Sequence, residues 1–225
     1  MRKLRFLFLA LPLLAACTPF ALTPSTQQTG TSSEIASSSL SPIDSQRAVA
    51  VLPFAYTSGS LLEIGKSTAP LTLIAFTNPS CSYCKEFFEQ DVPRLQTDFV
   101  APSTLHLEIA ILPMKKYPES EQEARALYCA AVQGKGAQMH GALFDLPQHT
   151  DAALLNAATA LGLDVPTFRT CLTSPEASTS LHEQQALEKK WKITLAPTLI
   201  LEGEKKVGLQ SYADLRGWIE VKLEK

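Results

Sequence analysis

The sequence lacks the features that mark several large functional classes. It has no long run of basic residues, and 22 acidic side chains outnumber 20 basic ones. Such a chain has no electrostatic reason to bind DNA or RNA, so we expect no nucleic-acid partner. It also lacks the Gly-rich loops that hold nucleotide phosphates and the His-Glu-x-x-His pattern of zinc proteases. We therefore expect neither a cofactor nor a metal.

Long apolar segments are also scarce, and the one near the N-terminus is short. Residues 6–16 are apolar and follow Arg2, Lys3 and Arg5, but eleven residues are too few to span a bilayer as a helix. A basic start followed by such a run is typical of a secretory signal peptide, which we assign to residues 1–16. The remaining chain has 17 basic and 22 acidic side chains, a net charge of −5.

The predicted signal peptide ends in Leu14-Ala15-Ala16, directly before Cys17. Small residues in front of a cysteine resemble the lipobox of bacterial lipoproteins. The resemblance implies cleavage before Cys17 and a diacylglycerol thioether on its sulfur. Each acyl methylene buried in a bilayer contributes about 0.8 kcal/mol, so several chains would anchor the protein stably. The alternative is ordinary signal cleavage, which leaves Cys17 as a free thiol.

A Ser/Thr-rich stretch follows, in which eleven of the 23 residues at 18–40 are Ser or Thr. A segment of this composition cannot bury enough apolar surface to offset its ordering entropy. We predict that residues 17–45 are a flexible tether between the lipid and a folded domain at residues 46–225. An additional folded domain in this stretch is the alternative, although its length and composition speak against it.

Cys81 and Cys84 form a C-x-x-C pair between a predicted strand and a predicted helix. Residues 71–76 are continuously apolar, which is typical of a strand buried on both faces. Apolar residues then recur at helical spacing, namely Cys84, Phe88, Val92, Leu95 and Phe99. The pair therefore lies in the first turn of a helix.

This position favours redox chemistry. The first N–H groups of a helix lack intrahelical partners and form the positive end of its dipole, so they favour a thiolate on Cys81. We predict that Cys81 is the catalytic nucleophile and that Cys84 is the catalytic resolving thiol, which attacks the mixed disulfide. A zinc site is one alternative, but the other cysteines and the four histidines are scattered. An inert disulfide is another, but so short a loop would add little stability.

The rest of the chain supplies the remaining elements of one α/β fold. Alternating apolar residues predict a strand over 105–111, and residues 198–201 and 205–209 predict a hairpin. Residues 212–223 predict an amphipathic closing helix, and the intervening residues 118–190 have mostly helical patterns. Strand, helix, strand, long helical segment, hairpin and helix together indicate a thioredoxin-like fold with an inserted α-helical domain.

Several stretches match the pattern of one family: residues 69–76 leading into Cys81-Ser82-Tyr83-Cys84, then 126–134, 139–144, 161–172 and 193–199. Over about residues 46–225 the chain resembles the DsbA-like family of secreted thiol–disulfide oxidoreductases. The resemblance implies that Pro197 is cis and lies beside the active-site sulfurs, where the Ala196 backbone would pair with an extended substrate peptide. An ordinary trans proline is the alternative. Tyr83 would either contact substrate or be a plain surface aromatic.

The chain departs from the family pattern near the cysteines. Asn78 stands where many relatives have Asp, and the strand at residues 71–76 contains no acid. Another group must then remove the proton from Cys84. Glu63 and Glu108 are the candidates, together with water.

Cys129 and Cys171 remain after the redox pair and Cys17 are assigned. An even number of cysteines in an oxidising compartment favours a structural disulfide between them, with two buried free thiols as the alternative. A disulfide between Cys129 and Cys171 would close the chain between them into a loop, and the chain-entropy model gives a loop of this length roughly 4 kcal/mol of stabilisation.

These observations predict an extracytoplasmic enzyme, lipid-anchored to a bacterial envelope membrane. We expect a monomeric dithiol oxidase that forms disulfides in exported cysteine-containing proteins, and a membrane redox partner that resets Cys81 and Cys84. An envelope reductase or isomerase is the first alternative, although the tether occupies the place where isomerising relatives have a dimerisation domain. A non-catalytic redox-linked chaperone or assembly factor is the second.

Overall fold

The computed structural model describes residues 54–56 and 61–225. The predicted signal peptide at 1–16, the lipid site Cys17 and the predicted tether at 17–45 lie outside the described residues. The described residues belong to one compact unit. Within the described residues, no helix combines the length and the apolar composition that a membrane span requires.

The described chain consists of short strands and helices. In order, its elements are β1 (Phe54–Tyr56), β2 (Leu62–Ile64), β3 (Leu71–Thr77), α1 (Ser82–Glu86), η1 (Phe87–Asp91), α2 (Val92–Leu95), η2 (Gln96–Val100), β4 (Leu105–Ile111), α3 (Ser120–Ala131), α4 (Gly136–Asp145), α5 (Asp151–Ala160), α6 (Val165–Leu172), α7 (Pro175–Trp191), β5 (Thr198–Leu201), β6 (Glu204–Val207) and α8 (Tyr212–Leu223).

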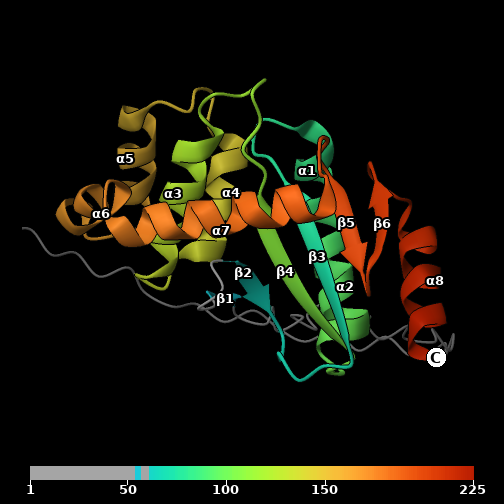
Figure 1. Ribbon diagram of the computed structural model, residues 1–225. Helices are drawn as coiled ribbons and strands as arrows, with labels where there is room; N and C mark the ends of the chain where they lie inside the picture. Colours follow the sequence, from blue (N-terminus) through green and yellow to red (C-terminus); the bar gives the residue numbers. More distant parts are fainter. Residues whose placement is uncertain (1–53, 57–60) are drawn as a thin grey trace, which may run out of the picture. The chain divides into compact units, whose positions relative to one another are not determined.

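The strands form one sheet in the order β1-β2-β4-β3-β5-β6 (Figure 1). The central strands β3 and β4 are parallel, with Leu71 opposite Leu105 and Thr77 opposite Ile111. All other neighbouring strands are antiparallel. The β3–helix–β4 unit followed by the β5–β6 hairpin and α8 confirms the predicted thioredoxin-like fold. The hairpin's second strand is shorter than predicted, because Gly208 has φ +87° and leaves the extended conformation.

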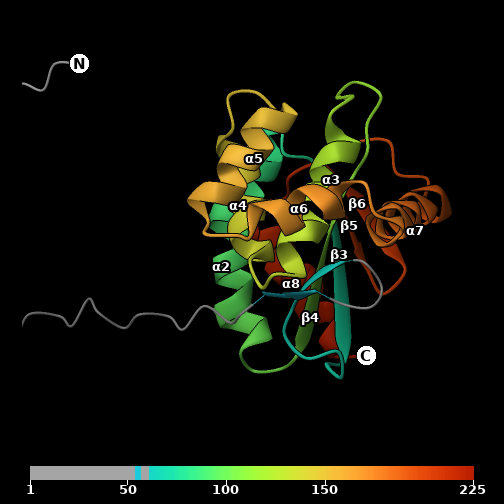
Figure 2. The same cartoon turned by 90° about the vertical axis from the view of Figure 1, so that its left-hand side faces the viewer.

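Helices cover both faces of the sheet (Figure 2). On one face, apolar residues of β3 and β4 such as Leu73 share one core cluster with Phe87, from the helix that follows β3, and with Leu215 of α8. On the other face, Phe76 and Ile200 pack with Leu187 of α7. Along a strand, neighbouring side chains point to opposite faces. This alternation determines which strand side chains can reach the cysteines.

The predicted helix after the cysteines runs from Ser82 to Val100 as alternating α-helical and π-helical segments. Pro93 lies within it and has no backbone N–H to donate, and wider turns lie on either side of it. As a result Phe87 is 1% exposed, whereas Phe88, which regular helical spacing predicts to be buried, is only partly buried.

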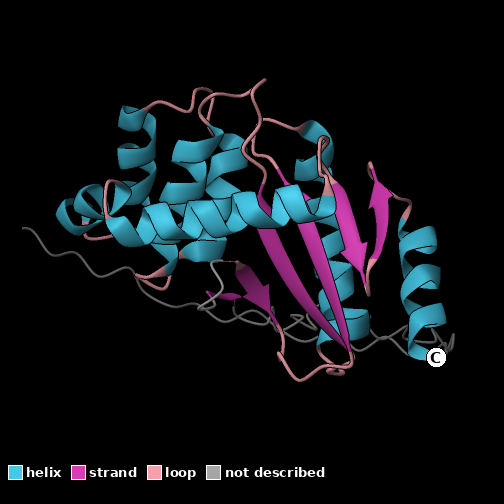
Figure 3. Ribbon diagram, viewed as in Figure 1, coloured by secondary structure: helices cyan, strands magenta, loops and turns pink. Residues whose placement is uncertain are grey.

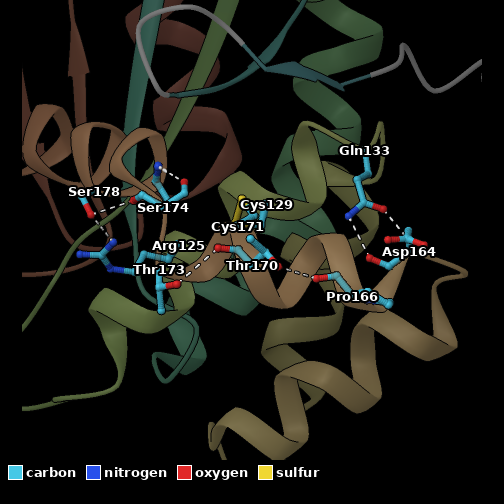
Figure 4. The surroundings of a disulfide bond; sticks show 11 residues. Arg125, Cys129, Gln133, Asp164, Pro166, Thr170, Cys171, Thr173, Ser174 and Ser178 are labelled. Carbon is cyan, nitrogen blue, oxygen red and sulfur yellow. Dashed lines mark hydrogen bonds between the residues drawn. A yellow bond between two sulfur atoms is a disulfide. The ribbon is translucent and has the colours of Figure 1, made fainter.

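Five helices, α3 to α7, lie between β4 and β5 and form the predicted helical insertion (Figure 3). Cys129 of α3 and Cys171 of α6 are joined by a disulfide with an S–S distance of 2.05 Å (Figure 4). Beside it, the Gln133 side chain exchanges two hydrogen bonds with the Asp164 backbone, at 2.9 and 3.3 Å. The disulfide therefore lies in a region where α3 and the start of α6 are also held by polar contacts.

Candidate active site

The two cysteines of the C-x-x-C pair lie where β3 passes into α1. Cys81 is the N-cap residue, with extended backbone angles of φ −107° and ψ 115°. Its carbonyl oxygen accepts hydrogen bonds from the N–H groups of Cys84 and Lys85, at 3.0 and 3.1 Å. The Cys81 side chain makes no capping bond. Its sulfur is therefore available for chemistry while its backbone begins the helix.

The two thiols differ sharply in access to solvent. Both are free thiols; Cys81 is partly exposed and Cys84 is 0% exposed. Burial raises the pKa of the Cys84 thiol far above its usual value, and a hydrogen bond with Cys81 raises it further. Cys84 thus keeps its proton at neutral pH. This geometry fits the predicted division into an accessible nucleophile and a shielded resolving thiol.

The loop before β5 brings the predicted substrate-binding residues to Cys81. The Ala196–Pro197 peptide bond is cis, as the family resemblance implies. The Cys81 Sγ donates a hydrogen bond to the Ala196 carbonyl oxygen at 3.4 Å. Two large side chains nearby in the chain are mostly exposed, Tyr83 at 61% and Leu195 at 57%. An extended apolar segment of a substrate protein could contact these side chains while one of its cysteine sulfurs reaches Cys81.

Asn78 holds the backbone that precedes Cys81. It is fully buried, and its Nδ2 donates to the Leu112 carbonyl oxygen at 3.0 Å and to Ser120 Oγ at 2.9 Å. Its Oδ1 accepts the N–H of Ser80 at 2.9 Å. A carboxylate could not make the two donated bonds, so the departure from Asp at this position has a structural role. It also leaves Cys84 without a carboxyl group at this site.

We predict that Asn78→Asp destabilises the protein by about 1–3 kcal/mol, because it leaves a buried carbonyl oxygen unpaired and buries a charge. Burial would raise the folded-state pKa of the new carboxyl, so the loss should be largest above that raised pKa, shrink as pH falls toward the unfolded value of about 4, and be smallest below it. Urea unfolding at pH 7 and pH 4 measures both effects. The control is Asn156→Asp on the exposed face of α5. Equal stability of the two variants would contradict the role given to Asn78.

We also predict that brief iodoacetamide treatment of reduced protein labels Cys81 before Cys84. Access alone favours Cys81, and the raised pKa of Cys84 keeps its sulfur in the unreactive thiol form. Peptide mapping by mass spectrometry reads out the order. Labelling of Cys84 should appear only at strongly alkaline pH or after unfolding. Preferential labelling of Cys84 at neutral pH would reverse the two assignments.

Glu63 and Glu108, the predicted proton acceptors for Cys84, do not lie near it. The two are cross-strand partners on β2 and β4 and share one face of the sheet. Along β4, Glu108 alternates with Ile109, which packs on the face covered by Phe87 and the rest of the helix that carries Cys84. The glutamates therefore face away from that helix. The position of each glutamate within its own strand is visible in the sequence. The face of the sheet that the two share depends on how the strands pair, which the sequence does not show.

These glutamates flank a buried histidine instead. His106 Nε2 is 3.3 Å from Glu63 Oε2, and its Nδ1 is 3.6 Å from Glu108 Oε1. The three side chains could hold a cation, since one ligand atom from each lies within 4.8 Å of the others. The same three side chains also fit a buried histidine that lies between two carboxylates without a metal.

A cavity of about 770 Å³ opens beside Cys81, between the start of α1 and the helical insertion. Lys85 on its wall forms an ion pair with Asp145 at 2.6 Å. His149, from the loop between α4 and α5, also lines it. The Nδ1 of His149 contacts Oε1 of Glu123, a residue of α3 that is 0% exposed. The imidazole of His149, in contact with the buried carboxyl group of Glu123, therefore lies on the wall of a cavity that Cys81 also lines.

Sequence reasoning missed this pair, because Glu123 and His149 lie 26 positions apart on separate elements. A glutamate in the buried stripe of a predicted helix was the one available signal. A second histidine, His140, lies at hydrogen-bond distance from Thr77 Oγ1, 3.4 Å, and its ring contacts Phe88 and Phe144. Burial lowers the pKa of His140 to about 3, so it is neutral and forms part of the core behind the cavity.

Comparison with known proteins agrees with this geometry. The family described as thioredoxin matches residues 57–221. A thioredoxin-like oxidoreductase from Silicibacter pomeroyi DSS-3 is 20% identical, with a TM-score of 0.65 over 74% of this chain and 94% of that one. Oxidised BdbD from Bacillus subtilis is 18% identical, with a TM-score of 0.66 over 78% and 99% of the two chains. The catalytic domain of Proteus mirabilis ScsC is 21% identical, with a TM-score of 0.63 over 76% and 93%.

No curated protein sequence matches the chain. The solved structures show a shared fold, and the family match covers well over half of the sequence. The C-x-x-C pair at the start of α1 supplies the two sulfurs that a redox enzyme of this fold needs. The chain therefore belongs to the thioredoxin family, as a thiol–disulfide oxidoreductase with a DsbA-like fold.

Proposed function

We propose that this enzyme is a dithiol oxidase that forms disulfide bonds in exported proteins. The observation that carries the proposal is the contrast between its two sulfurs. Cys81 is accessible and hydrogen-bonded to the Ala196 carbonyl oxygen, whereas Cys84 is buried beneath it. A substrate sulfur can therefore reach Cys81 alone.

The reaction starts from the Cys81–Cys84 disulfide. A substrate thiolate attacks Cys81 Sγ, the bond to Cys84 breaks, and Cys84 Sγ takes the electron pair and then a proton. The product is a mixed disulfide between the substrate and Cys81. A second substrate thiolate then attacks the substrate sulfur of that bond and releases Cys81 as a thiolate. The substrate loses two electrons and the cysteine pair gains them.

The buried resolving thiol favours this direction. In a mixed disulfide, Cys84 can return to attack Cys81 only as a thiolate, and its raised pKa keeps it protonated at neutral pH. The second substrate thiol then has time to complete the substrate disulfide. A reductase needs the opposite behaviour, because Cys84 must resolve each mixed disulfide quickly.

Disulfide transfer to a reduced, unfolded protein with two cysteines tests the proposal. Oxidised enzyme should pass one disulfide to each substrate molecule and be left with two free thiols at Cys81 and Cys84. Faster reduction of the oxidised substrate by the reduced enzyme would identify a reductase. Absence of transfer in both directions, with substrate aggregation still suppressed, would identify a chaperone.

The proposal includes export and attachment through a lipid on Cys17, followed by a tether at residues 17–45. A membrane redox partner would then reoxidise the reduced pair at the same surface. We predict that Cys17→Ala moves the protein from the membrane fraction to the soluble fraction, because no other acyl anchor would remain. Fractionation in 1 M salt separates lipid attachment from charge attraction, with wild type as the control. Retention of Cys17→Ala in membranes at high salt would overturn the lipid assignment.

A further inference from the structure

The buried histidine His106 has one ring nitrogen without a hydrogen bond. The residue is 3% exposed, and its Nε2 has no hydrogen-bond partner within the described residues. Glu63 Oε2 lies 3.3 Å from this nitrogen, but the two atoms do not form a hydrogen bond. An unpaired polar atom at this depth is costly, so we expect a partner for this nitrogen that the protein itself does not supply.

Two carboxylates lie beside the imidazole on the same face of the sheet. Glu63 of β2 is directly opposite Glu108 of β4, and His106 lies two positions before Glu108 on the same strand. Like charges directly opposite each other destabilise a strand pair. Among residues 54–56 and 61–225, no lysine or arginine forms an ion pair with either glutamate. The carboxylates therefore need positive charge, and one protonated imidazole would offset only half of theirs.

The spacing of the three side chains suits a small divalent ion. One ligand atom from each residue lies within 4.8 Å of the other two. A zinc ion bonded tetrahedrally to nitrogen and oxygen at about 2.0–2.1 Å keeps its ligand atoms about 3.3 Å apart. The distance from His106 Nε2 to Glu63 Oε2 already has this value, 3.3 Å. Glu108 Oε1 lies 3.6 Å from the other ring nitrogen, Nδ1, and rotation of the Glu108 side chain would bring it to the ion.

Ligand chemistry and access to solvent select the class of ion. Imidazole nitrogen binds Zn²⁺ and other transition metals, whereas Mg²⁺ and Ca²⁺ prefer oxygen ligands alone. The side chains of Glu63 and Glu108 are 16% and 20% exposed, so a hydrated ion can reach the carboxylates from solvent. Thr72 and Ile74 of β3, the partners of His106 and Glu108, bring no further ionisable ligand, so water would complete the coordination.

We propose that Glu63, His106 and Glu108 bind one divalent transition-metal ion, with Zn²⁺ as the ion that their nitrogen and oxygen donors fit. With a neutral imidazole, the two carboxylates balance the two charges of the ion. The ion would join β2 to β4, which otherwise pair over the three residues Leu62–Ile64 alone. Its role is structural, because the site faces away from the helix that carries the redox cysteines. The ligands come from separate strands, which no sequence motif joins.

Zinc binding to the oxidised Cys17→Ala protein tests the proposal. Its remaining cysteines are all in disulfides, Cys81 with Cys84 and Cys129 with Cys171, so no thiolate competes for the ion. Isothermal titration calorimetry should show one Zn²⁺ site per chain and no binding of Mg²⁺ at the same concentration. X-ray absorption should show nitrogen and oxygen ligands at about 2.0–2.2 Å.

Glu63→Gln, in the same Cys17→Ala background, removes one ligand at the solvent side of the site. It should weaken zinc binding at least about tenfold, because even the loss of an outer-shell partner costs about 10- to 100-fold in affinity. His106→Gln should weaken it likewise. The control is His182→Gln, at an exposed position of α7, which should bind zinc as the parent protein does. Disulfide transfer by Glu63→Gln should be unchanged, which would show that this variant is folded.

Amide hydrogen exchange reports where the ion binds. Zn²⁺ should slow exchange of the amides of β2, Leu62–Ile64, because the ion ties this short strand to β4. The same addition should have no effect on β2 in Glu63→Gln.

Three results would overturn the site. Equal zinc affinity in the parent, Glu63→Gln and His106→Gln would place the ion elsewhere, and equal binding of Mg²⁺ would contradict the role of the imidazole. Absence of zinc binding by the parent would remove the site altogether. Each of these results would leave the proposed oxidase function intact, because none of them involves the redox cysteines.

Discussion

Replacing Cys81 by serine should reduce disulfide transfer to the uncatalysed background, whereas Cys84→Ser should trap the enzyme in mixed disulfides with its substrates. Each variant replaces one sulfur atom by oxygen, but the two sulfurs of the wild-type protein lie in different environments. Cys81 is the accessible sulfur beside Ala196, so without it no substrate sulfur can be bonded. Cys84 is buried, so its loss removes the thiol that resolves the mixed disulfide but leaves Cys81, the site of attack, intact.

Non-reducing electrophoresis followed by mass spectrometry distinguishes the two results. Cys84→Ser should accumulate covalent complexes that reductant dissolves and that contain Cys81. Cys81→Ser serves as the matched control and should form none. Complexes linked through Cys84, or full activity of the Cys81→Ser variant, would contradict the assignment of roles.

Removal of the disulfide in the helical insertion should cost more stability than Asn78→Asp or loss of the active-site cysteines. Cys129 and Cys171 are separated by 42 positions, and a loop of this length contributes roughly 4 kcal/mol in the chain-entropy model. The double variant Cys129→Ala/Cys171→Ala should lose about that free energy of unfolding. It should still fold, because the core and the Gln133–Asp164 bonds remain.

Urea unfolding of the double variant against wild type measures this loss. The control is the active-site double variant Cys81→Ala/Cys84→Ala, whose sulfurs would close a much shorter loop and should contribute far less. The structural disulfide should also survive mild reductant that opens the active-site pair. A loss below about 1 kcal/mol in the Cys129/Cys171 variant would show that packing alone stabilises the insertion.

Local patterns were enough to predict the elements that carry the redox pair. The apolar run at residues 71–76 and the helical spacing after Cys84 are set by burial of neighbouring residues, so the strand–helix junction could be found directly. The short strands β1 and β2 could not, since three-residue strands carry almost no periodic signal. The π-helical segments around Pro93 were missed for a similar reason: they shift burial from Phe88 to Phe87 without changing composition.

Side-chain partnerships across the fold were the least predictable feature. Glu63 and Glu108 were expected near Cys84, but the antiparallel register of β2 and β4 places them together with His106 on the other face of the sheet. Glu123 and His149 meet only because the loop after α4 returns to α3 beside the cavity. Such contacts depend on tertiary packing, which a single sequence does not reveal residue by residue.

The reduction potential of the Cys81–Cys84 pair decides between an oxidase and a reductase. The helix start stabilises a thiolate on Cys81, and the Ser82-Tyr83 dipeptide is not the rigid Gly-Pro of thioredoxin but contains no cation, so the site should be oxidising but not extreme. Equilibration with glutathione at pH 7 should give a value above about −270 mV, that of thioredoxin, and below about −120 mV, that of DsbA. A value at or below about −270 mV would contradict the oxidase assignment and make the protein a reductase.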